Sequence, residues 1–317
     1  MDASAYWVGV TIGEGAFGRV VHAKHKATGK DVAIKVVEKV NLQKEPLHMQ
    51  AILNEKRVLS RWQSNLVVQL YAAFHDEECL YLVMPCLKGG DLSHLIRAGR
   101  RSRAWSGDSV SYYSLQILAA LEFIHSERIL HVDLKPDNIL LSGSGRIQLA
   151  DFGSAVSIST TKTKRTILRP LGTVDYSCPE LLRNSPDPTI GVDLWSFGCV
   201  LYAMFEGQSP FHDKSDALAV QRIVSYARKE TPLQMFAGDD AWRELISRLL
   251  RGDPVQRIGV SDYRDTGTFS YESIRSCAVW TTGGEHMPFV APVPDWWEKA
   301  QETPLKDGGA GWSAFLL

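Results

Sequence analysis

Apolar and polar residues alternate along the first part of the chain with the period of two that is typical of β-strands. Strands are predicted from Tyr6 onward and over residues 31–37, 66–74 and 79–84. Between the second and third of these runs, residues 46–62 carry apolar side chains such as Ile52 and Leu59 at helical spacing. The pattern predicts a β-rich first part with one helix.

The second part of the chain has mainly helical periodicity. Helices are predicted over residues 91–100, 109–125, 192–205 and 240–250, and a short strand pair over residues 139–141 and 147–150. The helix at 109–125 has one apolar face, formed by Tyr113, Ile117, Leu121 and Ile124. The helix at 192–205 is apolar nearly all round, so we expect it to be buried. Asp193 in this helix is either a helix-start cap or a brace for a neighbouring loop.

These elements predict a two-lobed α+β fold. Residues 6–87 form a small lobe of strands with one helix, residues 88–280 form a larger and mainly helical lobe, and residues 281–317 form a tail. The tail is rich in Gly and Pro and contains Trp296, Trp297 and Trp312. Such a tail either packs on the body or stays partly disordered, and the tryptophans favour packing.

Composition narrows the class of protein. The 317 residues are 44% hydrophobic, enough for a substantial core, and 35 basic residues nearly balance 36 acidic ones. Charge alone therefore indicates neither nucleic acid nor an anionic membrane as a partner. The five cysteines are scattered, as expected of reduced thiols in the cytosol. No signal peptide is visible, and the longest apolar stretch is too short to span a bilayer, so we expect a soluble, cytoplasmic protein.

The segment His131 to Asn138 concentrates groups for phosphoryl transfer. Asp133, Lys135 and Asn138 lie within one loop, and Asp151 follows in Asp-Phe-Gly. One carboxylate can accept a hydroxyl proton, an amide and a second carboxylate can hold Mg²⁺, and a lysine can balance charge. For any one of these residues alone, a solvated polar loop is the better interpretation; the spaced set favours the catalytic one.

A glycine-rich stretch precedes this loop in the chain. Gly13, Gly15 and Gly18 have the spacing Gly-x-Gly-x-x-Gly, with which a hairpin tip brings backbone N–H groups close to phosphates. Ordinary turns and Rossmann folds share this spacing, but no helix follows the last glycine directly, which argues against a Rossmann fold. The next strand carries Lys35, which is either a solvent-facing edge residue or a phosphate ligand.

Lys35 needs an anionic partner inside the cleft. Glu55 on the predicted helix is the preferred candidate, because Glu45 is explained by its place near the helix start. The segment Pro85 to Gly90 is a connector between the lobes, where the carbonyl of Pro85 and the N–H of Leu87 can bind a purine; the alternative is an ordinary loop. In the second lobe, Arg257 is predicted to pair with Glu180.

Taken in order, these motifs resemble the eukaryotic protein kinases over roughly residues 6–280. The series comprises the glycine loop, Val-Ala-Ile-Lys, a helix glutamate, Asp-Leu-Lys-Pro-x-Asn, Asp-Phe-Gly, Cys-Pro-Glu and Asp-Leu-Trp-Ser-Phe-Gly. Within that family the chain is most similar to the AGC group of serine/threonine kinases and, inside the group, to the phosphoinositide-dependent kinases. The resemblance implies a kinase that phosphorylates protein Ser/Thr hydroxyls and acts as a master kinase of other AGC kinases.

The resemblance also implies the site residues. Those implied for ATP are Gly13, Gly15, Phe17, Gly18, Val20, Ala33, Lys35, Met84, Pro85, Leu87, Asp91 and Leu140. Those implied for Mg²⁺ are Asn138 and Asp151, and those implied for catalysis are Asp133, Lys135, Lys35, Glu55 and Thr173. A pseudokinase scaffold, or a kinase of the calmodulin-regulated class, is the alternative; the complete chemical set favours an enzyme, and no basic amphipathic helix marks the tail.

One departure from the family pattern concerns the activation switch. Val132 replaces the arginine that usually binds an activation-loop phosphate, and Arg169 replaces the residue that usually carries that phosphate. Because both halves of the contact are replaced, we expect loop ordering that does not depend on phosphorylation at this site. The alternative is drift in a dispensable switch.

A second expectation concerns partners. In the resembled kinases, a groove beside the glutamate helix binds a hydrophobic motif of substrate kinases. The matching positions here are Lys39, Leu42, Gln43, His75 and Leu80, of which Gln43 is unusually polar for such a groove. The lipid-binding domain of those kinases has no counterpart in these residues, so they give no basis for arguing membrane recruitment.

Overall fold

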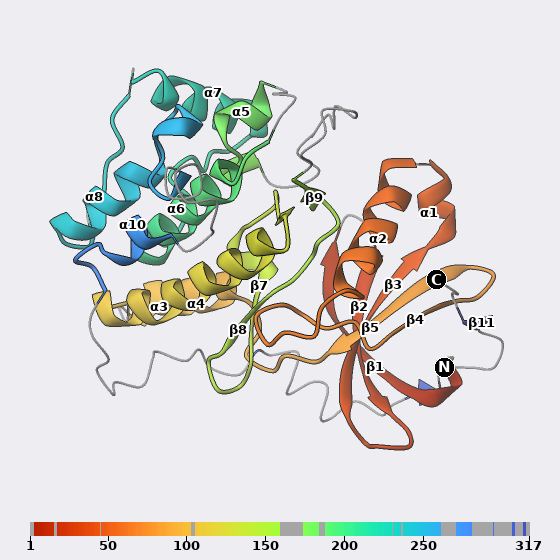
Figure 1. Cartoon of the computed structure of the whole chain (residues 1–317). Helices are drawn as coiled ribbons and strands as arrows, with labels where there is room; N and C mark the ends of the chain where they lie inside the picture. The colour runs from red at the N-terminus through yellow and green to blue at the C-terminus, as the bar shows by residue number, and fades with distance from the viewer. Residues whose placement is uncertain are drawn as a thin grey trace.

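The computed structural model describes residues 3–15, 18–44, 46–102, 105–158, 174–183, 188–229, 231–235, 237–260, 271–280, 294, 306–307 and 313–314. Figure 1 shows two lobes: a strongly twisted sheet flanked by two helices, and a larger lobe built mainly of helices. The predicted α+β, two-lobed fold is confirmed.

The small lobe is an antiparallel sheet in the order β10-β1-β2-β3-β5-β4-β11. Its strands are β1 (Tyr6–Gly15), β2 (Gly18–His25), β3 (Asp31–Glu38), β4 (Ala72–His75), β5 (Cys79–Pro85), β10 (Lys306–Asp307) and β11 (Ser313–Ala314). Alternate residues of β3 face opposite sides, as the period of two requires. Val32, Ile34 and Val36 pack in one apolar cluster, whereas Val37 belongs to a second one beside the helices.

Two predicted elements of this lobe are corrected. The helix predicted over residues 46–62 is α2 (Pro46–Leu59), and a short helix α1 (Lys39–Lys44) precedes it that the pattern did not predict. The strand predicted over residues 66–74 begins only at Ala72. The reason lies in the backbone hydrogen bonds, since Val68 N donates to Leu149 O and Leu149 N donates to Leu66 O. Residues 66–68 therefore pair with the large lobe instead of extending the sheet.

The large lobe contains the remaining helices and two short antiparallel strand pairs. The helices are α3 (Leu92–Ser102), α4 (Gly107–Ser126), α5 (Pro179–Leu182), α6 (Gly191–Glu206), α7 (Asp216–Ala227), α8 (Asp240–Leu249) and α10 (Glu272–Arg275). The pairs are β6 (Ile129–Leu130) with β9 (Val156–Ser157), and β7 (Ile139–Leu141) with β8 (Ile147–Leu149). Within the described ranges, no helix is both long and apolar enough to cross a membrane.

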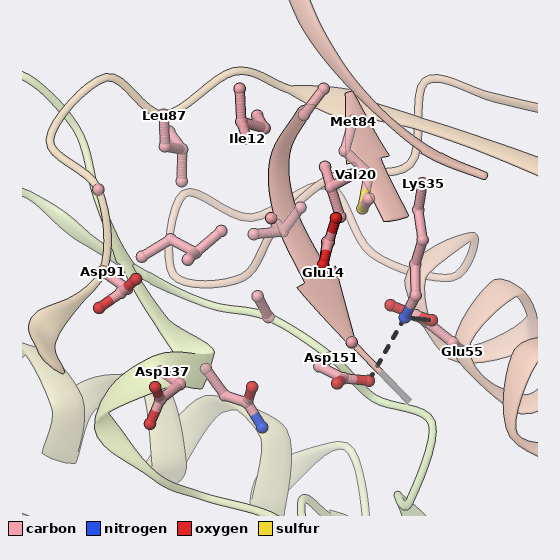
Figure 2. Close-up of a pocket in the computed structure, with 18 of the residues that line it drawn as sticks. Ile12, Glu14, Val20, Lys35, Glu55, Met84, Leu87, Asp91, Asp137 and Asp151 are labelled. Atoms are coloured by element: carbon pink, nitrogen blue, oxygen red, sulfur yellow. Dashed lines mark hydrogen bonds and ion pairs between the residues drawn. The ribbon is translucent and has the colours of Figure 1, made fainter. Parts of the chain in front are cut away.

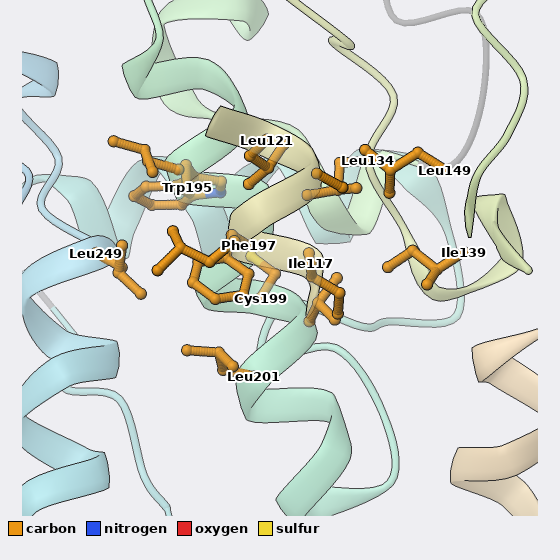
Figure 3. Close-up of a cluster of buried hydrophobic side chains, with 14 of the residues drawn as sticks. Ile117, Leu121, Leu134, Ile139, Leu149, Trp195, Phe197, Cys199, Leu201 and Leu249 are labelled. Carbon is orange, nitrogen blue, oxygen red and sulfur yellow. The ribbon is translucent and has the colours of Figure 1, made fainter. Parts of the chain in front are cut away.

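The core of the large lobe forms around α6, as its apolar sequence predicts. Figure 3 shows Trp195, Phe197 and Leu201 of this helix packed between Ile117 of α4 and Leu249 of α8. Next to this core, the predicted pair of Arg257 and Glu180 is present as a bidentate contact.

The described tail residues pack back on the small lobe. Strand β10 pairs with β1, and β11 pairs with β4 through Ser313 opposite His75 and Ala314 opposite Phe74. This agrees with the expectation that the tail packs on the body, and it places the two tail strands at opposite margins of the sheet. Trp296, Trp297 and Trp312 lie outside the described residues.

Candidate active site

A cleft between the two lobes has a volume of about 510 Å³, which suits a small ligand. Every predicted site residue that the structure describes lines it, namely Gly13, Gly15, Gly18, Val20, Ala33, Lys35, Glu55, Met84, Pro85, Leu87, Asp91, Asp133, Lys135, Asn138, Leu140 and Asp151. Phe17 and Thr173 lie outside the described residues. Figure 2 shows Lys35, Glu55 and Asp151 on one side of the cleft, with Leu87 and Asp91 on the other.

Lys35 is held by two carboxylates. Strand β3 directs it toward α2, where its Nζ lies 2.6 Å from Oε2 of Glu55, and the second carboxylate, Asp151, is 3.7 Å away. The predicted pairing with Glu55 is thus present, whereas Glu45 lies outside the described residues. Burial alone would lower the pKa of the Lys35 ammonium, but the two carboxylates more than offset it and raise that pKa. Lys35 therefore presents a fixed positive charge to the cleft.

The loop after β6 brings an acid, a cation and an amide together. Lys135 Nζ donates to Oδ2 of Asp133 at 2.9 Å. Asn138 Nδ2 donates to the backbone oxygen of Asp133 at 2.8 Å and to its Oδ2 at 3.1 Å. These bonds orient the Asp133 carboxylate. They also engage the amide nitrogen of Asn138, whose amide oxygen is a ligand type that Mg²⁺ prefers.

The carboxylate of Asp193 braces this loop by accepting two backbone hydrogen bonds from it. Its Oδ2 accepts from the backbone N–H of His131 and its Oδ1 from that of Val132, both at 2.8 Å. The helix cap is instead Ile190, which makes no side-chain capping bond. Of the two roles predicted for Asp193, the structure shows the brace.

Asp151 follows β8 with a positive φ of 60°, a conformation that is uncommon for residues other than glycine. Burial alone would raise the pKa of its carboxyl, but nearby positive charges, Lys35 first among them, hold it below its usual value. Phe152 is fully buried, with its ring 5.6 Å from that of Trp62 and 4.8 Å from that of His131. The Asp151 carboxylate is therefore ionised and held in place by the packing of the next residue.

An asparagine next to Glu55 ties α2 to the Asp-Phe-Gly segment. Asn54 Nδ2 donates to the backbone oxygens of Phe152, Gly153 and Ala155 at 3.1, 3.2 and 2.6 Å. Arg57 in turn donates to Oδ1 of Asn54 at 2.7 Å. The contact uses a neutral amide and needs no phosphate. This contact could not be predicted from the sequence, because an asparagine on a helix gives no signal of its partner.

The three glycines of the glycine loop differ in how closely other protein atoms approach them. Only Gly18 strictly requires glycine, because its φ is 149° and a Cβ there would lie 2.1 Å from the backbone oxygen of Val36. A Cβ at Gly13 would make ordinary contact with Val20, and one at Gly15 would meet nothing within 4 Å.

Sequence reasoning missed several residues that line the cleft. They are Ile12, Glu14, Val68, Gly90, Asp137, Ala150 and Ser154. Most adjoin a recognised motif, so adjacency was a usable signal. Val68 is different, because only the fold brings it to the cleft.

The five positions of the predicted docking groove come together on α1, β4 and β5. Lys39 Nζ donates to Nδ1 of His75 at 3.3 Å. Leu42 and Leu80 are buried in a small apolar cluster, and Gln43 is exposed. Both leucines are therefore almost completely covered by their neighbours.

Comparison with known proteins assigns the class. Residues 6–267 match the protein kinase domain, and the chain therefore belongs to the protein kinase family.

Among its relatives is 3-phosphoinositide-dependent protein kinase 1 of Arabidopsis thaliana, 35% identical over 309 residues that cover 94% of this chain and 57% of the relative. The human protein of the same name is 31% identical over 88% of this chain and 49% of its own length. The Aurora kinase of Schizosaccharomyces pombe is 36% identical over 80% of this chain and 68% of the relative. The chain thus spans about half the length of the two phosphoinositide-dependent relatives.

Proposed function

We propose that this chain is an ATP-dependent serine/threonine protein kinase. The observation that carries the proposal is the convergence of Lys35, Asp133, Asn138 and Asp151 on one cleft of suitable volume. Residues 6–87 form the nucleotide-binding lobe, residues 88–280 the catalytic lobe, and residues 281–317 the tail.

The residues present fit ATP and Mg²⁺. An amide oxygen and an ionised carboxylate, those of Asn138 and Asp151, are hard oxygen ligands that suit Mg²⁺, and Lys35 supplies a fixed positive charge for phosphate oxygens. When bound, Mg²⁺ neutralises charge on the phosphates. Asp133 accepts the proton of the substrate hydroxyl, and Lys135, bonded to Asp133, balances the charge beside it.

The test is transfer of labelled phosphate from ATP to a Ser/Thr peptide library. We expect wild-type transfer to require Mg²⁺, and Asp133→Asn to lower turnover by about 10²-fold or more. Asp240→Asn, at a fully exposed carboxylate on α8, serves as the matched control. If wild type bound nucleotide without transferring phosphate, the chain would be a pseudokinase scaffold.

The activation segment is proposed to be ordered without phosphorylation at the position of Arg169. Arg169 lies outside the described residues, but the Asn54 contacts to three backbone oxygens support the proposal, since they hold the start of the segment without a phosphate. Phosphatase-treated protein should keep its activity. Loss of activity that a single phosphate at Thr166 or Thr173 restored would contradict this.

A docking role toward other AGC kinases is the last part of the proposal. The similarity to 3-phosphoinositide-dependent protein kinases supports it, together with the cluster of Leu42 and Leu80 beside α1. A peptide with two phenylalanines and an acidic end should bind and stimulate wild type. Leu80→Glu should abolish the stimulation. Leu218→Glu, which changes an exposed leucine on α7, should not. Equal stimulation of all three proteins would exclude docking at this surface.

A further inference from the structure

A chain of buried polar groups runs from the last described helix of the large lobe to the loop that carries Asp133. The Tyr271 hydroxyl is hydrogen-bonded to Nδ1 of His125. Nε2 of His125 lies 2.7 Å from Oδ2 of Asp193, which accepts the N–H of His131. The side chains of Tyr271, His125 and Asp193 are completely buried. Residues far apart in sequence thus form one continuous relay.

The relay ends at a strained residue. Val132 has a φ of 70°, a left-handed conformation that β-branched side chains strongly disfavour. Such a conformation persists only where the surroundings enforce it. The N–H of Val132 donates to Oδ1 of Asp193, so the brace acts on the strained residue itself.

The far end of the relay fixes the orientation of the imidazole. Because an aspartate lies at Nε2, that nitrogen carries a proton and donates to the carboxylate. Nδ1, the other ring nitrogen of His125, is hydrogen-bonded to the Tyr271 hydroxyl. The tyrosine ring stands edge-on to the imidazole, with an interplanar angle of 88°. Tyr271 thereby fixes the angle at which the His125 imidazole meets Asp193.

We propose that Tyr271 is a positioning residue for the loop that carries Asp133. It acts through His125 and Asp193 to hold Val132 in its left-handed conformation, and so keeps Asp133 oriented for proton acceptance. The kinetic part of this proposal rests on the proposed kinase activity, whereas the structural part does not.

The kinetic test removes only the hydroxyl. Tyr271→Phe should lower kcat about tenfold, the factor expected for one lost buried hydrogen bond, with the KM for ATP unchanged within about twofold. Glycine adopts positive φ without strain, so in a Val132→Gly background the same substitution should change kcat by less than about twofold. Tyr113→Phe is the matched control, because Tyr113 is also completely buried on α4 but lies 12 residues before His125. An equal loss of kcat from Tyr271→Phe in both backgrounds would overturn the proposal.

Amide hydrogen exchange supplies a readout independent of turnover. The N–H groups of His131 and Val132 should exchange about tenfold faster in Tyr271→Phe and at the wild-type rate in Tyr113→Phe. Unchanged exchange would refute the relay even if turnover fell, and faster exchange with unchanged kcat would refute the positioning role. Should Tyr271→Phe not fold, His125→Gln offers the same two measurements. A wild type with slow exchange at both amides but no turnover would contradict the proposed function and leave the relay intact.

Discussion

Removing the Arg257 side chain should destabilise the large lobe strongly. The guanidinium is completely buried and binds both carboxylate oxygens of Glu180. It also donates to the backbone oxygens of Gly191 at 2.7 Å and Arg251 at 2.8 Å, and lies 5.0 Å from the Trp195 ring. Arg257→Ala leaves the mostly buried Glu180 carboxylate without its counter-charge and opens a void beside the start of α6.

The expected cost is that of breaking a buried ion pair, about 3–5 kcal/mol of unfolding free energy. For a lobe of this size, each kcal/mol shifts the melting temperature by roughly 2–4 °C, so the loss should be on the order of 10 °C. Thermal and urea unfolding followed by circular dichroism would measure both quantities.

Two further variants decide whether buried charge is the cause. Arg243→Ala removes an arginine whose partner, Asp240, is fully exposed, and it should change stability far less. Replacing both members of the buried pair, by Arg257→Met with Glu180→Leu, leaves no uncompensated charge and should be less destabilising than Arg257→Ala alone. The reasoning is refuted if both arginine truncations cost the same, or if the double variant is the least stable.

The remaining predictions concern the cleft and its supports. Gly18→Ala should raise the KM for ATP by about tenfold or more, because its Cβ would clash with the backbone of β3. Asn54→Leu should lower kcat/KM about tenfold through loss of the contacts to the Asp-Phe-Gly segment, measured by steady-state transfer. Burial alone would raise the pKa of the Asp193 carboxyl, but the hydrogen bond from His125 holds it below its usual value. A carboxyl whose pKa is lower in the folded state than in the unfolded state stabilises the fold above the unfolded-state pKa of about 3.9. This stabilisation is lost as the pH falls toward the folded-state pKa. The free energy of unfolding measured in urea should therefore be level from about pH 7 to 5 and fall below about pH 4.

Each of these predictions has a control. Gly143→Ala should leave the KM for ATP nearly unchanged, since its Cβ meets nothing within 4 Å and Gly143 does not line the cleft; an equal effect at Gly18 and Gly143 would contradict the steric argument. Asn41→Leu replaces an exposed asparagine on α1 and should preserve kcat/KM. In Asp193→Asn the fall of stability below about pH 4 should be shallower, and an identical slope would show that other carboxyls cause it.

The residues of the candidate active site could be predicted from the sequence more completely than the helices and strands around them. Lys35, Glu55, Asp133, Asn138 and Asp151 could be identified because phosphoryl transfer requires those residue types in a fixed order, and the structure brings them together. Their roles in turnover stay predictions. Hydrophobic periodicity placed α4, α6 and α8 nearly correctly, because each buries a long face in one core.

Periodicity failed where distant partners decide the structure. Residues 66–71 have the composition of a strand, yet the backbone bonds of Leu66 and Val68 go to Leu149 of the large lobe. Helix α1 is too short to show a period. The reach of Asn54 to backbone oxygens almost one hundred residues later follows from no local pattern. Tyr271 likewise lies 146 residues from His125.

The pairing of β10 with β1 and of β11 with β4 has a consequence for solubility. Outer strands with free N–H and C=O groups are templates on which other chains add, and here two residues of the tail cover part of each outer strand. A chain truncated before Lys306 would present both rims of the sheet to its neighbours. We therefore expect the tail strands to protect the small lobe from edge-to-edge aggregation, and light scattering of the shortened chain would measure the loss of that protection.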